Sequence, residues 1–153
     1  MFELLLTLHI FSAFWLMSHL ISSAFWKARA DRSDNREQIA NTARALVWSD
    51  LVFNGPGILG LLATGIWMGS MTGWDRFQEP WLAISFILTM LLAVLWLAVL
   101  MPQQRRMSRL AREILGGNPH VEAYKRASMV WSITGGIATL IPVIVLVLMV
   151  FKP

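Results

Sequence analysis

Two histidines lie inside an otherwise apolar stretch near the N-terminus, TLHIFSAFWLMSHL, which covers residues 7–20. An imidazole is costly to place in hydrocarbon, so ionisable residues in membrane segments usually mark a ligand site, an ion path or a proton relay. A histidine can bind a metal, carry a proton, or hydrogen bond to a neighbouring helix. His9 and His19 are therefore the residues whose chemistry most needs an explanation.

The polar residues of this stretch fall on one side of the helix that the sequence predicts. At about 100° per residue, every polar side chain from His9 to Ser23 projects within one half of the helix circumference. The opposite arc holds large apolar side chains, namely Ile10, Phe14, Met17, Ile21 and Phe25. Because lipid cannot satisfy polar groups, the polar half has to face protein, a cofactor or water.

The two histidines belong to the first of four long runs that carry almost no charge. These runs cover residues 2–26, 45–68, 81–101 and 127–151. A bilayer core of about 30 Å needs roughly 20 apolar residues in a helix, and each run is long enough. Charged residues make up 14% of the chain, against about a quarter in soluble domains. The sequence predicts an all-α fold, a polytopic four-helix membrane bundle that forms a single transmembrane domain.

Positive charge is concentrated in two connections between these runs. Eleven of the thirteen Lys and Arg residues lie there: Lys27, Arg29, Arg32, Arg36 and Arg44 in one, and Arg105, Arg106, Arg109, Arg112, Lys125 and Arg126 in the other. The positive-inside rule places both basic loops in the cytoplasm and both termini outside, in a bacterial inner membrane. Anionic lipids are the expected partners of this charge, and nucleic acid is not. The chain has no cysteine, which excludes thiolate metal sites.

A polar stripe on the second predicted helix matches the one on the first. Asp50, Asn54, Gly57, Leu61 and Thr64 project within about 40° of one another. At about 1.5 Å per residue, Asp50 lies at a height similar to that of His19. A facing carboxylate and imidazole form either a proton relay, a second ligand site, or a structural polar pair that ties two helices together.

His9 lies in the outer half of the first helix, level with Gly60, Thr89 and Pro142. It is either an axial ligand of haem iron or a hydrogen-bonding partner of a serine or threonine on another helix. No second histidine lies at that depth, so a methionine, an open position or a neighbouring subunit has to complete the iron coordination. Glycines on the second helix are expected to leave room for a flat group. The candidate cofactor-binding residues are His9, His19, Asn54, Gly57 and Gly60.

Several short motifs resemble those of a group of small four-helix bacterial membrane proteins. They are Leu8-His9-Ile10, the break from Asn54 to Pro56 followed by Thr64-Gly65, and the C-terminal apolar run that ends in Lys152-Pro153. The sequence is most similar to the integral membrane family called domain of unknown function 2269, through Trp48-x-Asp50-Leu51-x-Phe53 and Trp96-Leu97. The same group includes HemJ-type protoporphyrinogen oxidase and copper-resistance-D-like proteins.

The resemblance to the oxidase implies haem b bound by the histidine of the Leu-His-Ile motif, here His9. The oxidase also relies on a lysine in its third helix, whereas residues 81–101 contain no lysine or arginine. This difference argues against protoporphyrinogen oxidation. We therefore expect a haem-b or related tetrapyrrole protein of membrane redox chemistry, which would be a haem-dependent oxidoreductase if it is an enzyme.

Partners follow from the same expectation. The chain is expected to be a homo-oligomer or a subunit of a membrane complex, with a quinone as a further partner. Two other functions remain open at this point. One is a cofactor-free accessory subunit of a larger membrane complex, and the other is a small transporter that uses His19 and Asp50.

Overall fold

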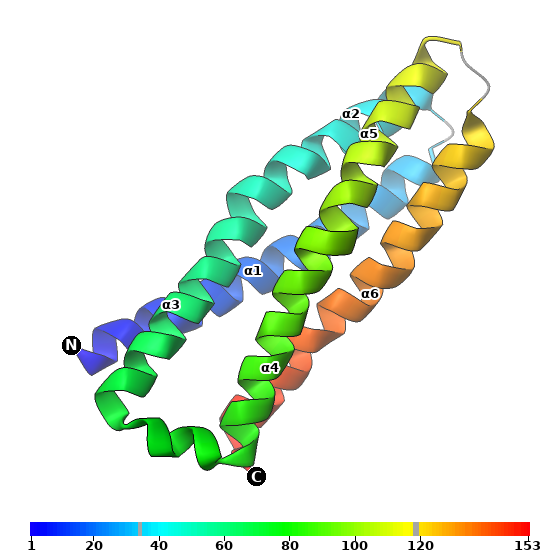
Figure 1. Cartoon of the computed structure of the whole chain (residues 1–153). Coiled ribbons are helices and arrows are strands. Elements are labelled where there is room, and N and C mark those ends of the chain that lie inside the picture. Colours follow the sequence, from blue (N-terminus) through cyan, green and yellow to red (C-terminus); the bar gives the residue numbers. More distant parts are fainter. Residues whose placement is uncertain (34, 118–119) are drawn as a thin grey trace.

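The computed structural model describes residues 1–33, 35–117 and 120–153. Four long helical segments make up most of this part of the chain, and they run side by side as one elongated bundle (Figure 1). The segments are Phe2–Asp31, Arg36–Thr72, Pro80–Leu115 and Val121–Phe151, and each is long and apolar enough to cross a membrane. The predicted all-α, four-helix membrane fold is therefore confirmed.

Two of the four segments are interrupted by a short π-helical turn. The helices are α1 (Phe2–Asp31), α2 (Arg36–Ser49), α3 (Gly55–Thr72), α4 (Pro80–Leu95), α5 (Met101–Leu115) and α6 (Val121–Phe151). The turn Asp50–Asn54 joins α2 to α3, the turn Trp96–Leu100 joins α4 to α5, and a 3-10 helix, Trp74–Gln78, precedes α4. Helix α1 packs against α3, α2 and α6, while α5 packs against α2 and α6.

The helices extend further at the basic end than the sequence predicted. Most described residues between the first two apolar runs are helical, because α1 continues to Asp31 and the Asn35 side chain caps α2 by accepting from the backbone N–H groups of Glu37 and Gln38. The third apolar run ends at residue 101, but the helical segment continues past it, since Pro102 lies in the first turn of α5, where a missing N–H is tolerated. Helix α5 is amphipathic and buries Met107 and neighbouring side chains.

Proline explains both π-helical turns. Pro56 and Pro102 each lie two residues after a π turn, and a proline ring clashes with the carbonyl group four residues earlier. The wider turn lets the N–H of Gly55 bond to the carbonyl of Asp50, and the N–H of Met101 bond to that of Trp96. The irregularity predicted near Asn54 therefore takes the form of a π turn. Such turns occur frequently at functional sites.

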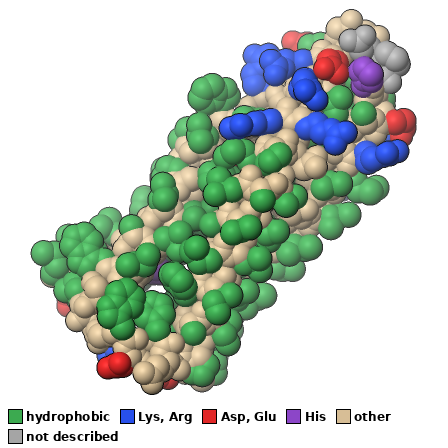
Figure 2. Space-filling model, in the orientation of Figure 1, with side chains coloured by type: hydrophobic (Ala, Val, Ile, Leu, Met, Phe, Trp, Pro, Cys, Tyr) green, Lys and Arg blue, Asp and Glu red, His purple; other side chains and the backbone are tan. Residues whose placement is uncertain are grey.

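Charge and apolar surface are separated along the bundle. Figure 2 shows Lys and Arg side chains gathered at one end of the visible face, with hydrophobic side chains over most of the remainder. Figure 1 shows that this end carries the α1–α2 and α5–α6 connections, and that both termini lie at the opposite end. Both termini lie at the same end of the bundle, as an even number of membrane crossings requires.

Candidate functional site

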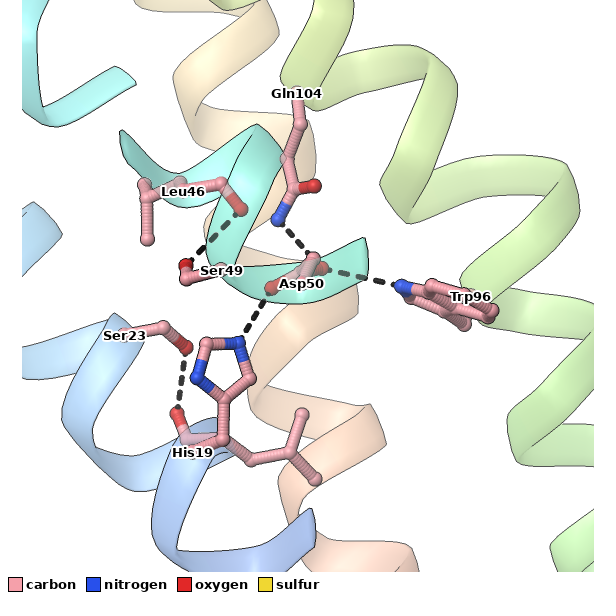
Figure 3. A network of polar contacts seen from close by, with 8 residues as sticks. His19, Ser23, Leu46, Ser49, Asp50, Trp96 and Gln104 are labelled. Carbon is pink, nitrogen blue, oxygen red and sulfur yellow. Dashed lines mark hydrogen bonds and ion pairs between the residues drawn. The ribbon is translucent and has the colours of Figure 1, made fainter. Parts of the chain in front are cut away.

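Asp50 is the centre of a polar network inside the bundle (Figure 3). Its exposed fraction is 3%. The Nε2 atom of His19 lies 2.8 Å from Asp50 Oδ1, the Trp96 indole N–H donates to Oδ2 at 3.1 Å, and the Gln104 amide donates to Oδ2 at 2.8 Å. Three side chains from two other helical segments, Phe2–Asp31 and Pro80–Leu115, thus converge on Asp50. An ionised carboxylate, which only accepts hydrogen bonds, satisfies all three donors.

The pairing of His19 with Asp50 was expected from their depths, but Trp96 and Gln104 were not foreseen. Asp50 and Trp96 occupy the same place, the first residue of a π turn. In both segments this residue lies six positions before a proline. That shared spacing, Asp50 to Pro56 and Trp96 to Pro102, was the available signal in the sequence that these two residues occupy equivalent places.

Aromatic stacking fixes the orientation of the His19 ring. Phe53 stacks on it with ring centroids 5.2 Å apart and planes inclined by 13°, and Trp15 stacks on Phe53 at 5.1 Å. Since Nε2 faces Asp50, the second ring nitrogen, Nδ1, points away from the carboxylate (Figure 3). The imidazole therefore has one nitrogen on the carboxylate and one available to a different partner.

A cavity of about 200 Å³ borders Asp50 on the side of α6, and we call it the inner cavity; its lining is mainly apolar but includes several polar groups. Three buried polar atoms of its lining residues have no hydrogen-bond partner within the described residues: Asn54 Oδ1, Gln104 Oε1 and Trp131 Nε1. The amide of Gln104 is oriented by its donation to Asp50, so its oxygen is an acceptor. A water molecule takes about 30 Å³ in the liquid and binds where several polar partners converge. The inner cavity meets both requirements.

His9 makes a simpler contact in the outer half of the bundle. Its Nδ1 lies 2.8 Å from the Thr64 hydroxyl oxygen, and that hydroxyl donates to the carbonyl of Gly60. Because the hydroxyl proton is already used, Nδ1 is the donor to Thr64, and Nε2 keeps a free lone pair. The interhelical hydrogen bond to a threonine, one of the two interpretations of His9, is present. The same tautomer also suits a metal-binding imidazole, whose other nitrogen normally donates to an acceptor.

His9, Thr89 and Pro142 line one cavity, as their predicted depths suggested. This outer cavity is about 100 Å³ in volume and mainly apolar, and Met149 of α6 also lines it. An imidazole and a thioether form a donor set that suits haem iron. The volume, however, corresponds to only a few water molecules, so the cavity does not enclose a tetrapyrrole. The donors fit the iron, and the enclosed space does not fit the ring.

The room expected above the glycines of α3 is occupied by α1. A Cβ atom added to Gly57 would lie 3.1 Å from the Cβ of Leu16, and one added to Gly60 would collide with the Ser12 hydroxyl. These glycines allow the two helix backbones to approach closely, as small residues commonly do in membrane bundles. They leave no space for a flat group at these two positions.

A second ionic cluster, which the sequence did not reveal, ties α1 to α6. Lys27 was counted among the loop charges, but it is 2% exposed and contacts the Asp31 carboxylate. It also donates to the Ser128 hydroxyl at 2.8 Å, while Ser128 and Tyr124 donate to Asp31 at 2.9 and 2.8 Å. The four-residue spacing of Lys27 and Asp31 was the available signal.

These features define a class, an integral membrane protein of four helical spans with ionisable groups buried inside it. The chain belongs to the family described as predicted integral membrane protein (DUF2269), whose model matches residues 3–153. No curated protein and no solved structure matches the chain. Among the described residues, no group of three or more His, Cys, Asp or Glu side chains is arranged to hold a metal ion.

Proposed function

We propose that this membrane protein transfers protons through the Asp50–His19 pair, as part of membrane redox chemistry. The observation that carries the proposal is the position of this pair between two spaces: Asp50 lines the inner cavity, and His19 lines a separate groove between α1 and α2. Paired ionisable residues inside a membrane bundle are typical of proton relays. A purely structural tie does not require access from both sides.

The geometry suggests a role for each residue. Unpartnered polar atoms around the inner cavity support water next to Asp50. Asp50 takes a proton from that water and passes it to Nε2 of a neutral His19 that carries its proton on Nδ1. The imidazolium that forms gives its Nδ1 proton to an acceptor in the groove, and the carboxylate is restored. Phe53 and Trp15 keep the ring aligned for that transfer. Trp96 and Gln104 hold the carboxylate in place.

Infrared difference spectroscopy of the protein in lipid nanodiscs, recorded as pH is changed, tests the proposal. We expect a protonated-carboxyl band that shifts in D₂O and disappears in Asp50→Asn. The exposed carboxylate of Asp75 supplies the matched control, Asp75→Asn. Labelling the aspartates of the wild-type protein with ¹³C tests the band without any substitution. A wild-type spectrum with no aspartate band would overturn the proposal.

Haem binding at His9 is a second proposal, favoured by the tautomer that Thr64 imposes and by Met149 on the same cavity. It ranks below the first because the outer cavity does not enclose a tetrapyrrole. When bound, haem would supply one-electron redox chemistry, with His9 and Met149 as the residues that hold the iron. This assignment keeps the redox function expected from the sequence.

An absorption spectrum of the purified protein, oxidised and then reduced with dithionite, tests the haem proposal. Haem bound at His9 would give a stoichiometric b-type signal that is lost in His9→Ala and kept in His120→Ala, whose side chain is exposed before α6. A colourless wild-type protein from cells with ample haem would exclude it. With neither haem nor proton exchange, the function left is that of an accessory subunit of a larger membrane complex, which co-purification would test.

We also propose that the basic end faces the cytoplasm of a bacterial inner membrane and binds anionic lipids there. Four arginines of α5 line one groove next to the apolar residues Leu97 and Met101: Arg105, Arg106, Arg109 and Arg112. Each cation near an anionic surface contributes about 1 kcal/mol. Replacing all four with glutamine should reduce the phosphatidylglycerol that co-purifies with the protein, and unchanged lipid content would contradict the assignment.

A further inference from the structure

The groove that His19 lines is an open space of about 610 Å³ between α1 and α2, and we call it the lateral groove. Its lining combines four aromatic side chains with hydroxyl groups and one imidazole. The residues used below are Trp15, Ser18, His19, Ser22, Trp26 and Phe53. The volume is in the range of small-molecule sites, which are mostly apolar with a few polar groups.

The hydroxyl groups of this groove differ from the others on α1. Thr7, Ser12 and Ser23 each donate to a backbone carbonyl of the preceding turn. Ser18 and Ser22 are exposed, and in the described part of the chain their hydroxyls make no hydrogen bond. Hydrocarbon chains of lipid cannot satisfy such groups. The lateral groove therefore suits an occupant that brings its own hydrogen-bond acceptors into the membrane.

The aromatic residues indicate a flat occupant. Trp15, Phe53 and His19 form a continuous stack along one wall of the groove, and Trp26 lies further toward the basic end of α1. Aromatic rings favour offset or edge contacts with other planar rings. The His19 Nδ1 atom lies at the edge of this stack and points away from Asp50. A planar ring with a carbonyl oxygen at its edge satisfies both features.

We propose that the lateral groove binds the head group of a lipid-soluble quinone. One quinone carbonyl accepts a hydrogen bond from Nδ1 of His19 in its imidazolium form, and the hydroxyls of Ser18 and Ser22 donate to other oxygens of the head group. The ring packs against the aromatic wall, and the apolar tail leaves through the open side of the groove into the bilayer. This inference rests on the proposed proton transfer, because it names the partner of His19.

Photo-crosslinking of the wild-type protein in nanodiscs with an azido-quinone tests this assignment. Peptide mass spectrometry should place the label between Phe14 and Trp26 or between Thr42 and Phe53, and an excess of decylubiquinone should remove it. Ser22→Trp fills the groove and should lower labelling by about tenfold. The matched control is Ser70→Trp, at an exposed serine of α3 outside the groove, which should keep wild-type labelling.

The readouts separate this inference from the proposed function. A wild-type aspartate band in the infrared spectrum without competable labelling would overturn the quinone assignment and leave proton transfer standing. Labelling without the infrared band would refute proton transfer and keep the binding site. Label that phospholipid displaces and decylubiquinone does not would identify the groove as a lipid site, and would also overturn the assignment. Circular dichroism of each variant verifies the fold before comparison.

Discussion

His9 and His19 lie on the same helix, but the groups that surround their imidazole rings are very different. His9 has a neutral side-chain partner, the Thr64 hydroxyl, beside a small apolar cavity. His19 faces a carboxylate that also accepts from Trp96 and Gln104 and that borders the inner cavity. The role of a histidine inside a membrane bundle is therefore best inferred from the groups around it. A charged partner, two further donors and access to two spaces support chemistry at His19 more strongly than at His9.

The largest effect is expected from removing the carboxylate of the inner network. Asp50→Ala leaves His19, Trp96 and Gln104 without their common acceptor, and breaking a buried charged contact typically costs about 3–5 kcal/mol. Titration of the protein in mixed micelles with SDS, followed by circular dichroism, measures the change in the free energy of unfolding. A loss below about 1 kcal/mol would be no larger than that of a single interhelical hydrogen bond in a membrane. It would contradict the conclusion that His19 has the more strongly bound partner of the two histidines.

Much of this architecture follows from the sequence, because apolar runs, helical periodicity and loop charge obey simple rules. These rules predicted four spans, the polar face of α1, and the shared depth of His19 and Asp50. They missed Lys27, because its position after the apolar run resembled a loop, although Asp31, Tyr124 and Ser128 surround it. They also misjudged Gly57, since a glycine that admits a cofactor and one that admits a neighbouring helix look identical in sequence.

The cluster around Lys27 is a third polar contact of α1, and like that of His19 it involves a carboxylate. Lys27→Met leaves the Asp31 carboxylate without its cation. The Asp31 side chain is 31% exposed, so water offsets part of the loss, and we expect a decrease of about 2 kcal/mol in the free energy of unfolding. Lys125→Met is the matched control, since its pair with Glu122 is exposed and is worth about 0–1 kcal/mol. Equal effects of the two substitutions would contradict the buried assignment.

Helix α1 carries both histidines and also packs closely on α3. The contribution of this backbone packing to stability therefore has to be measured separately from that of the polar contacts. Gly57→Ala places a Cβ atom 3.1 Å from the Leu16 Cβ, and overpacking of this kind costs about 1–3 kcal/mol. Gly136→Ala in α6 is the control, because an added Cβ there has no neighbour within 4 Å. SDS unfolding should be easier for the first variant alone. If both behave like wild type, the α1–α3 contact is looser than the 3.1 Å approach of Gly57 to Leu16 implies.

The smallest change in the free energy of unfolding is expected when the partner of His9 is removed. Thr64→Val keeps the shape of the side chain and removes the acceptor for Nδ1, and interhelical hydrogen bonds in membranes are worth about 0.6 kcal/mol on average. The same unfolding titration should therefore detect a change several times smaller than that of Asp50→Ala. A large destabilisation would mean that His9 is held for more than helix packing. Because Thr64 sets the His9 tautomer, a haem spectrum altered in the same variant would then favour iron binding at His9.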